Sequence, residues 1–167
     1  MLESNNRNFN HLKIHTQYSI CEGAIKIDNL KDFCKENKIP CLGLSDTSNL
    51  CGALEFAENI SKVGTQPIIG TQIFFRFEDT TGLLPLIALN EKGYKRIIEL
   101  SSKSYLENDA LSDPHLDINE LLRDTEGVLL LTGTIQGLFG KLFQKGRLEE
   151  ITKLYKNLLS KFHNNFY

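Results

Sequence analysis

The 167-residue sequence predicts an α/β fold built on a mainly parallel sheet or barrel, for two reasons. Strand-like and helix-like segments alternate along the chain, which is typical of βα units. The strand-like segments are also short and almost wholly apolar, as at 83–89 and 127–131. Such runs belong to strands that are buried on both faces, as in a sheet covered by helices.

The first strand-like segment lies within residues 9–23. Because side chains alternate between the two faces of a strand, we expect His11, Lys13 and His15 to share one face, with the two aliphatic residues between them buried behind it. The turn that follows carries Glu22. Two imidazoles and a carboxylate at the carboxyl end of a strand are typical of a metal site in an α/β enzyme. The middle position of this face is a lysine, however, whose positive charge repels metal ions. The segment therefore resembles a metal-site scaffold that has lost its metal chemistry.

The remaining elements follow from the spacing of apolar residues and from turn residues. Helices are predicted at 26–38, 49–63, 91–107, near 118–123, at about 135–144 and at 147–162. Strands are predicted at 41–46, 67–77, 83–89 and 127–131. Pro40 closes the first helix, Gly64 caps the second, and Glu-Asp-Thr-Thr-Gly at 78–82 forms a turn. The last four residues are typical of a turn entering a new strand, so we expect this sequence to be a fragment of a longer domain.

The composition excludes several classes of function. Nineteen basic and twenty-one acidic residues give a net charge of −2, which disfavours DNA binding by this segment alone. The apolar runs are far shorter than a membrane span, and the polar first ten residues lack the apolar core of a signal peptide. We therefore expect a cytoplasmic protein that does not contact the membrane.

Four cysteines occur at positions 21, 34, 41 and 51. No Cys-x-x-Cys spacing is present, so the sequence contains neither a zinc knuckle nor a thioredoxin-like motif. Disulfides are uncommon in cytosolic proteins. We expect all four to be reduced thiols that are buried or half-buried.

Five segments occur together in the order and spacing of one known family, and they lie at 11–19, 42–53, 66–72, 88–94 and 126–133. They resemble the amino-terminal PHP (polymerase and histidinol phosphatase) domain of bacterial DNA polymerase III alpha subunits. The resemblance runs from about residue 9 to Tyr167. It implies that residues 1–8 are a disordered or extended N-terminus and that 9–167 are the N-terminal part of a PHP domain.

This resemblance implies a distorted βα barrel, incomplete in this fragment, whose carboxyl-end loops hold up to three metal ions in active members. Those members hydrolyse phosphoesters, because clustered divalent ions generate hydroxide at neutral pH and neutralise the charge that develops on the phosphate. The ligands of such a cluster are neutral imidazoles and carboxylates, which second-shell hydrogen bonds hold in place.

The family's His-x-His pair falls on Lys13 and His15, and its next acidic position falls on Glu22. Its Asp-His dipeptide falls on Asp46 and Thr47, and a glutamate ligand falls on Gln72. Only His15 and Glu22 could still bind a metal ion strongly, and the remaining ligands of the family would lie beyond Tyr167. The resemblance therefore implies a vestigial pocket with no catalytic residue, no expected metal and no cofactor in this fragment.

Each pocket residue also has a simpler interpretation. We expect His15 to be a hydrogen-bonded structural histidine rather than a ligand. Asp46 is expected to cap a helix or to brace a loop, and Gln72 to act as a neutral hydrogen-bonding group. Lys13 either forms an ion pair with Glu22 or Asp46, in place of a lost metal, or is simply solvated. The sequence favours neither interpretation of the lysine.

Three features outside the pocket have simple structural interpretations. His115 and His163 lie in polar surroundings and are expected to be solvated. The aromatic run at 74–77 is expected to be a core strand with one exposed residue. Platforms that stack nucleic-acid bases come with a basic groove, which this sequence lacks.

The favoured function is a non-catalytic structural and interaction module of a replicative polymerase. The resemblance implies that the parent protein is a DNA-directed DNA polymerase, whose Mg²⁺-dependent chemistry and DNA binding reside in domains absent from this fragment. It also implies that alpha subunits with degenerate PHP sites bind a separate proofreading exonuclease subunit, beside other replicase subunits.

Two other functions remain open. An active metal-dependent phosphoesterase, either a 3′–5′ exonuclease or a small-molecule phosphatase, would require the full set of histidine and carboxylate ligands. Lys13, Thr47 and Gln72 count against it. An unrelated βα enzyme of the TIM-barrel type has only the alternation of strands and helices in its favour.

Overall fold

The computed structural model describes residues 9–109 and 112–167. The predicted disordered or extended N-terminus at 1–8 therefore lies outside the described residues. The helices are α1 (Ile27–Asn37), α2 (Ala53–Ser61), α3 (Glu91–Leu106), α4 (Ile118–Arg123), α5 (Leu138–Gln144) and α6 (Leu148–Phe162), with a 3₁₀ turn η1 (His163–Asn165). The strands are β1 (Cys41–Thr47), β2 (Gln66–Phe77), β3 (Thr80–Ala88), β4 (Leu116–Asp117) and β5 (Val128–Leu130).

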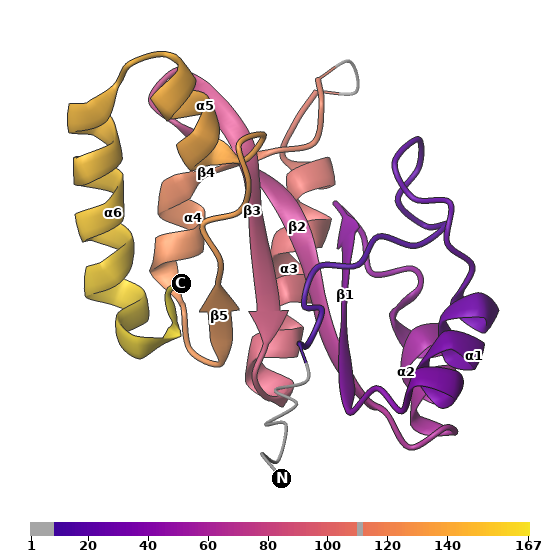
Figure 1. Cartoon of the computed structure of the whole chain (residues 1–167). Coiled ribbons are helices and arrows are strands. Elements are labelled where there is room, and N and C mark those ends of the chain that lie inside the picture. Colours follow the sequence, from indigo (N-terminus) through magenta and orange to yellow (C-terminus); the bar gives the residue numbers. More distant parts are fainter. Residues whose placement is uncertain (1–8, 110–111) are drawn as a thin grey trace, which may run out of the picture.

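These strands form one sheet in the order β1-β2-β3-β5, with the short β4 also paired to β2. In Figure 1, α3 lies behind β2 and β3, while α1 and α2 lie beside β1. Helix α6 lies on the opposite side of the molecule, beyond β5, and α5 packs against β3. The predicted α/β class is confirmed, and most predicted element boundaries agree with the structure to within a few residues.

The sheet is mixed rather than mainly parallel. β1 and β4 pair parallel to β2, whereas β2 with β3 and β3 with β5 are antiparallel. Only Glu78 and Asp79 separate β2 from β3. Since a parallel pair needs a crossover of about a dozen residues or more, this short connection permits only a hairpin. The predicted turn at 78–82 was too long, because β3 already begins at Thr80.

The predicted first strand is an extended segment beside β1 rather than a regular strand. Isolated bridges join Ile14 to Leu44 and Thr16 to Ile25. The backbone N–H of Ile14 donates to the carbonyl of Gly43 (3.1 Å), and the Gly43 N–H donates to the carbonyl of His11 (2.7 Å). A Cβ at position 43 would lie 2.6 Å from the Cα of Leu12, so only glycine allows the segment to approach β1 this closely.

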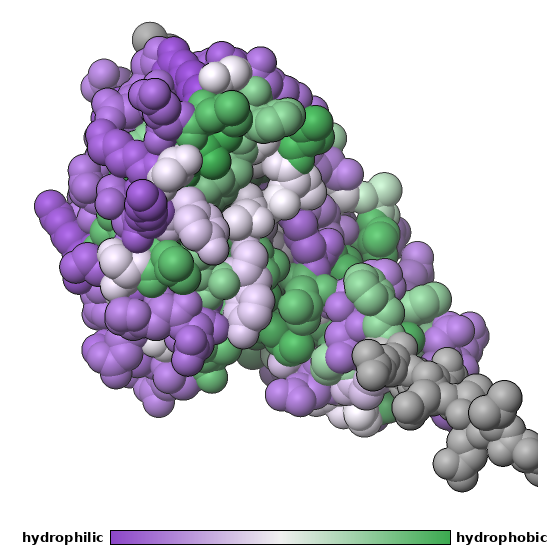
Figure 2. Space-filling view, turned by 60° about the vertical axis from the view of Figure 1, so that its left-hand side comes forward, coloured by the Kyte–Doolittle hydropathy of each residue, from purple (hydrophilic) through white to green (hydrophobic). Residues whose placement is uncertain are grey.

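Two apolar clusters hold the elements together. The larger one joins β2, β3 and β5 to α3, α4, α5 and α6, and the smaller one joins β1 to α1 and α2. In the aromatic run, Phe75 and Phe77 are buried and Arg76 is exposed, as expected. In Figure 2 the molecule is turned so that the left-hand side of Figure 1, with α5 and α6, comes forward. On this face, hydrophobic patches lie between hydrophilic ones.

The cysteines are free thiols, as predicted, but their burial differs from the prediction. Cys34 is buried and Cys41 is half-buried, whereas Cys21 and Cys51 are exposed because each lies in a turn rather than on the apolar face of an element. Within the described ranges, no helix combines the length and the apolar character needed to cross a bilayer.

Candidate functional site

The site forms where β1 ends beside the middle of β2. Thr47, the last residue of β1, pairs with Gln72, and Gln72 pairs on its other side with Pro85 of β3. The extended segment before α1 lies along the outer side of β1 and brings Lys13 and His15 to the same place. Three stretches of chain far apart in the sequence therefore meet over one row of strand residues.

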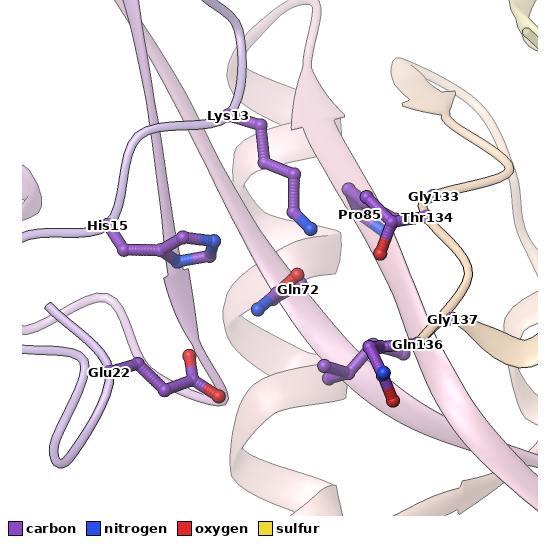
Figure 3. A pocket seen from close by; sticks show the side chains of 10 residues that line it. Lys13, His15, Glu22, Gln72, Pro85, Gly133, Thr134, Gln136 and Gly137 are labelled. Atoms are coloured by element: carbon purple, nitrogen blue, oxygen red, sulfur yellow. The ribbon is translucent and has the colours of Figure 1, made fainter.

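A pocket of about 240 Å³ lies over this row. It is lined by Lys13, His15, Glu22, Gln72, Leu83, Pro85, Gly133, Thr134, Gln136 and Gly137. Figure 3 shows Lys13, His15 and Glu22 on one side, Gln72 at the base, and the loop that carries Thr134 and Gln136 on the other side.

Asp46 lies beside the pocket rather than on its wall. Its side chain is fully buried, and its two oxygens accept hydrogen bonds from the Thr16 N–H (2.6 Å), the Thr16 hydroxyl (2.7 Å) and the Ser19 hydroxyl (2.7 Å). Hydrogen bonds from three donors fix the orientation of a carboxylate. In this geometry Asp46 braces the loop that follows the extended segment.

Thr47, Gln72 and Glu22 form a directed chain of hydrogen bonds. The side-chain amide N–H of Gln72 donates to the Thr47 hydroxyl (2.7 Å), and this hydroxyl donates to the Glu22 carboxylate. Gln72 is only 2% exposed, and its amide oxygen Oε1 finds no hydrogen-bond partner among the residues that the structure describes. The chain thus leaves one buried acceptor unused beside the pocket.

His15 and Lys13 carry the titratable nitrogens of the pocket. The Nδ1 atom of His15 lies 3.4 Å from the Ser19 hydroxyl, which links it to Asp46. Burial lowers the pKa of His15, and the nearby Lys13 ammonium lowers it further. Burial likewise lowers the pKa of Lys13, although the carboxylate of Glu22 partly opposes this.

Four of the six predicted pocket residues line the pocket, namely Lys13, His15, Glu22 and Gln72. Thr47 is hydrogen-bonded to two of them, whereas Asp46 lies beside the pocket. Of the two interpretations of Lys13, the structure does not show the ion pair: within the described part of the chain, no carboxylate oxygen lies within 4.0 Å of its amine. The carboxylate of Asp46 is instead saturated by the neighbouring hydroxyls and N–H group. His11 does not line the pocket with Lys13 and His15; it lines a separate hollow with Ile14 and Phe33.

Sequence reasoning missed the opposite wall of the pocket, which is the loop 133–137 before α5. This loop is held by a bridge between Gly137 and Leu83 and by the close approach of α5 to β3. A Cβ at Gly82 would lie 2.4 Å from the Cα of Leu138. The glycines at 82, 133 and 137 were the available signal, but glycine alone does not reveal which distant segments touch.

Sequence comparison now identifies the domain. The family model described as the PHP domain matches residues 11–167, which is nearly the whole chain. The chain belongs to the PHP family.

Curated relatives of this PHP domain from several bacteria are described as DNA polymerase III subunit alpha. The relative from Caulobacter vibrioides is 34% identical over 100% of this chain and 15% of its own length. The relative from Rickettsia felis is 35% identical over 90% of the chain and 12% of its own length, and that from Vibrio cholerae is 31% identical over 95% and 14%. The chain therefore spans only a small part of the relatives it matches.

Solved structures resemble the chain more weakly. A putative metal-dependent phosphoesterase from Bifidobacterium adolescentis aligns with a TM-score of 0.48 at 16% identity, over 59% of this chain and 34% of its own. An amidohydrolase from Chromobacterium violaceum aligns with a TM-score of 0.48 at 15% identity, over 58% of this chain and 33% of its own.

Proposed function

We propose that this chain is the N-terminal part of the PHP domain of a DNA polymerase III alpha subunit, and that its pocket is a degenerate metal site with a structural role. The shared description of relatives at 31–35% identity supports the parent protein. The hydrogen-bond chain from Gln72 through Thr47 to Glu22 supports the degenerate pocket, because it occupies the groups that would otherwise face a metal.

The residues present do not fit the metal cluster that the family implies. The Lys13 ammonium has no lone pair for a metal ion, and the Thr47 hydroxyl directs its proton to Glu22. Both oxygens of Asp46 are already taken by three donors. Among the described residues, no three His, Cys, Asp or Glu side chains are placed to hold an ion together. We therefore assign no catalytic step to this pocket.

The rest of the function follows from the proposed parent protein. Polymerisation, DNA binding and the Mg²⁺ that they require belong to other domains of the alpha subunit, which acts in the cytoplasm. The PHP domain serves as the docking platform for the proofreading exonuclease subunit within the replicase. A near-neutral domain with a pocket of hydrogen-bonded, non-ligating side chains suits a scaffold.

Calorimetric titration of the cognate exonuclease subunit into the full-length alpha subunit tests the docking role. We expect association at micromolar concentrations or tighter, and an affinity within about twofold of wild type for His15→Ala, since the scaffold role does not use the pocket. Absence of association between two folded proteins would reject the docking role.

Elemental analysis tests the degenerate pocket separately. We expect less than one equivalent of zinc or manganese after purification in the presence of both metals. Stoichiometric metal, together with phosphoester hydrolysis that chelators abolish, would instead establish the phosphoesterase alternative.

A further inference from the structure

The turn between β2 and β3 carries two carboxylates, and both pair with cations of the α5–α6 unit, which comprises residues 138–162. The Lys153 amine donates to the carboxylate of Glu78 (2.8 Å). The Arg147 guanidinium donates to both carboxylate oxygens of Asp79, which is the bidentate geometry that makes an arginine–carboxylate pair strong. These hydrogen bonds from Arg147 lower the pKa of Asp79 to about 2, so this carboxyl group is ionised at neutral pH.

The next two residues of the hairpin receive two further cations of the same unit. Lys145 donates to the Thr80 hydroxyl (2.8 Å), and Lys141 donates to the backbone carbonyl of Thr81 (2.9 Å). Four successive residues of the hairpin therefore each accept hydrogen bonds from a different cation of the α5–α6 unit. In Figure 1, the connection between α5 and α6 lies at the same end of the sheet as the β2–β3 turn.

The α5–α6 unit depends on the hairpin for its counter-charges. Residues 138–162 contain six Lys and Arg residues but only two Asp and Glu residues. Of the four cations that reach the hairpin, only Arg147 has a carboxylate of the unit itself within 4.0 Å among the described residues, namely Glu150 at 3.4 Å. The hairpin carboxylates thus reduce the repulsion among cations that would otherwise be close together.

The apolar anchorage of α5 is small by comparison. This helix has seven residues, and its buried residues are Leu138 and Leu142. A helix of two turns is not stable by itself and needs contacts with its surroundings. Exposed ion pairs usually contribute little to stability, but bidentate arginine pairs and networks of several charges are the exceptions. We therefore expect the contacts at residues 78–81 to affect the position of α5.

The position of α5 in turn determines the second wall of the pocket. The loop 133–137, which forms this wall, leads directly into α5, and the backbone N–H of Lys141 donates to the carbonyl of Gly137 (3.0 Å). Gly137 also bridges to Leu83 of β3. Because the loop is continuous with the helix, a shift of α5 away from the hairpin moves the wall of the pocket as well.

We propose that residues 78–81 form an electrostatic latch, which holds α5 and the adjoining pocket wall against the sheet and releases them when its ionic contacts are screened. In about 1 M salt the Debye length falls to roughly 3 Å, so exposed charges no longer attract one another effectively. Neutralising Glu78 and Asp79 should have the same effect as salt, because it removes the two carboxylates of the latch. This device goes beyond the structural role proposed above and does not depend on it.

Hydrogen–deuterium exchange of the full-length protein, read by mass spectrometry, tests the latch. The double variant Glu78→Gln, Asp79→Asn should exchange roughly threefold faster or more at 133–144 than the wild type in low salt, while exchange in β1 stays unchanged. About 1 M NaCl should produce the same rise at 133–144 in the wild type but add little in the double variant, whose latch is already released.

A matched control removes the same two charges from ion pairs elsewhere. In the double variant Asp28→Asn, Glu91→Gln, the lost pairs are with Lys31 and Lys95, and each lies within a single exposed helix. Exchange at 133–144 should remain at the wild-type rate in this control, with the same response to salt.

Three results would overturn the proposal. These are unchanged exchange at 133–144 in the variant without the two latch carboxylates, an undiminished salt effect in that variant, or an equal rise in β1, which would indicate general destabilisation. Circular dichroism shows whether the variant is folded. If it is not, Arg147→Lys replaces it, because this change keeps the charge and loses the bidentate geometry. Faster exchange at 133–144 is expected there too, and its absence would equally overturn the latch.

Discussion

Thr47 and Gln72 lie opposite each other across the parallel pair β1–β2, and a hydrogen bond of 2.7 Å joins their side chains. The Thr47 hydroxyl in turn donates a hydrogen bond to the carboxylate of Glu22, which lies in the turn before α1. A buried amide, a hydroxyl and an exposed carboxylate thus form one directed chain across three segments. This chain ties the turn that carries Glu22 to the centre of the sheet.

Replacing Thr47 by valine should break this chain at its centre. The buried amide N–H of Gln72 would lose its acceptor, and leaving a buried donor unpaired costs about 1–3 kcal/mol. Urea unfolding of the variant measures this change in the free energy of unfolding. Thr152→Val serves as the control, because the Thr152 hydroxyl is on an exposed face of α6 and donates to the carbonyl of Leu148 within the same helix. An equal loss of stability from both substitutions would contradict the conclusion that this hydrogen-bond chain stabilises the fold.

Asp46→Asn should destabilise the protein through the loop that Asp46 braces. The amide keeps the shape of the carboxylate but loses the charge, and its NH₂ group faces donors that already point at it. Loss of these charge-assisted hydrogen bonds should cost about 1.5–3 kcal/mol. Denaturant unfolding beside Asp28→Asn gives a matched comparison, since Asp28 is exposed and makes only a surface ion pair with Lys31. A loss below 0.5 kcal/mol, a rough limit for surface substitutions, would count against the bracing role.

Gly43→Ala should displace the extended segment from β1. The added methyl group would lie 2.6 Å from the Cα of Leu12 and 2.7 Å from its carbonyl oxygen, so the segment must move, at a cost of roughly 1–3 kcal/mol. NMR signals of the His15 ring should shift, because His15 follows on this segment. Gly64→Ala is the control: its positive φ also makes alanine unfavourable, but an added methyl group meets no atom within 4 Å. Unchanged His15 signals in Gly43→Ala would refute the predicted displacement.

The alternation of elements predicted the fold class, and together with the resemblance to the PHP family it led us to expect His15, Asp46 and Gln72 near one another. Strand order places the end of β1 beside β2, and alternation along the extended segment places Lys13 and His15 together. Side-chain hydrogen bonds within a loop follow no regular sequence spacing of this kind. For this reason the roles of Thr16 and Ser19 around Asp46 could not be predicted, and neither could the lack of an ion pair at Lys13.

The opposite wall of the pocket was unpredictable for a different reason. Residues 133–137 reach it only because Gly82 allows α5 to pack directly against β3. This contact joins segments more than fifty residues apart and depends on the exact packing of the sheet. The antiparallel β2–β3 hairpin, by contrast, follows from the two residues between its strands and was within reach of the sequence.

The titration of His15 should report on its neighbour Lys13. The pKa of His15 lies below its ordinary value because burial disfavours the charged ring and because the Lys13 ammonium repels it. Lys13→Met removes the second cause, so the pKa of His15 should rise, as NMR titration of the ring can measure. A lysine that has moved away into solvent would leave the pKa of His15 unchanged in this variant.

The same lowered pKa makes the stability of the fold depend on pH. Above an ordinary histidine pKa of about 6.5, His15 is neutral in both the folded and the unfolded chain, so its ionisation does not change the free energy of unfolding. As the pH falls below this value, the unfolded chain binds the proton first, so the free energy of unfolding decreases until the folded pKa is passed. Urea unfolding between pH 8 and pH 5 should show this decrease in the wild type. The decrease should be smaller in His15→Gln, which cannot bind the proton, and equal pH profiles for the two proteins would show that His15 is not its source.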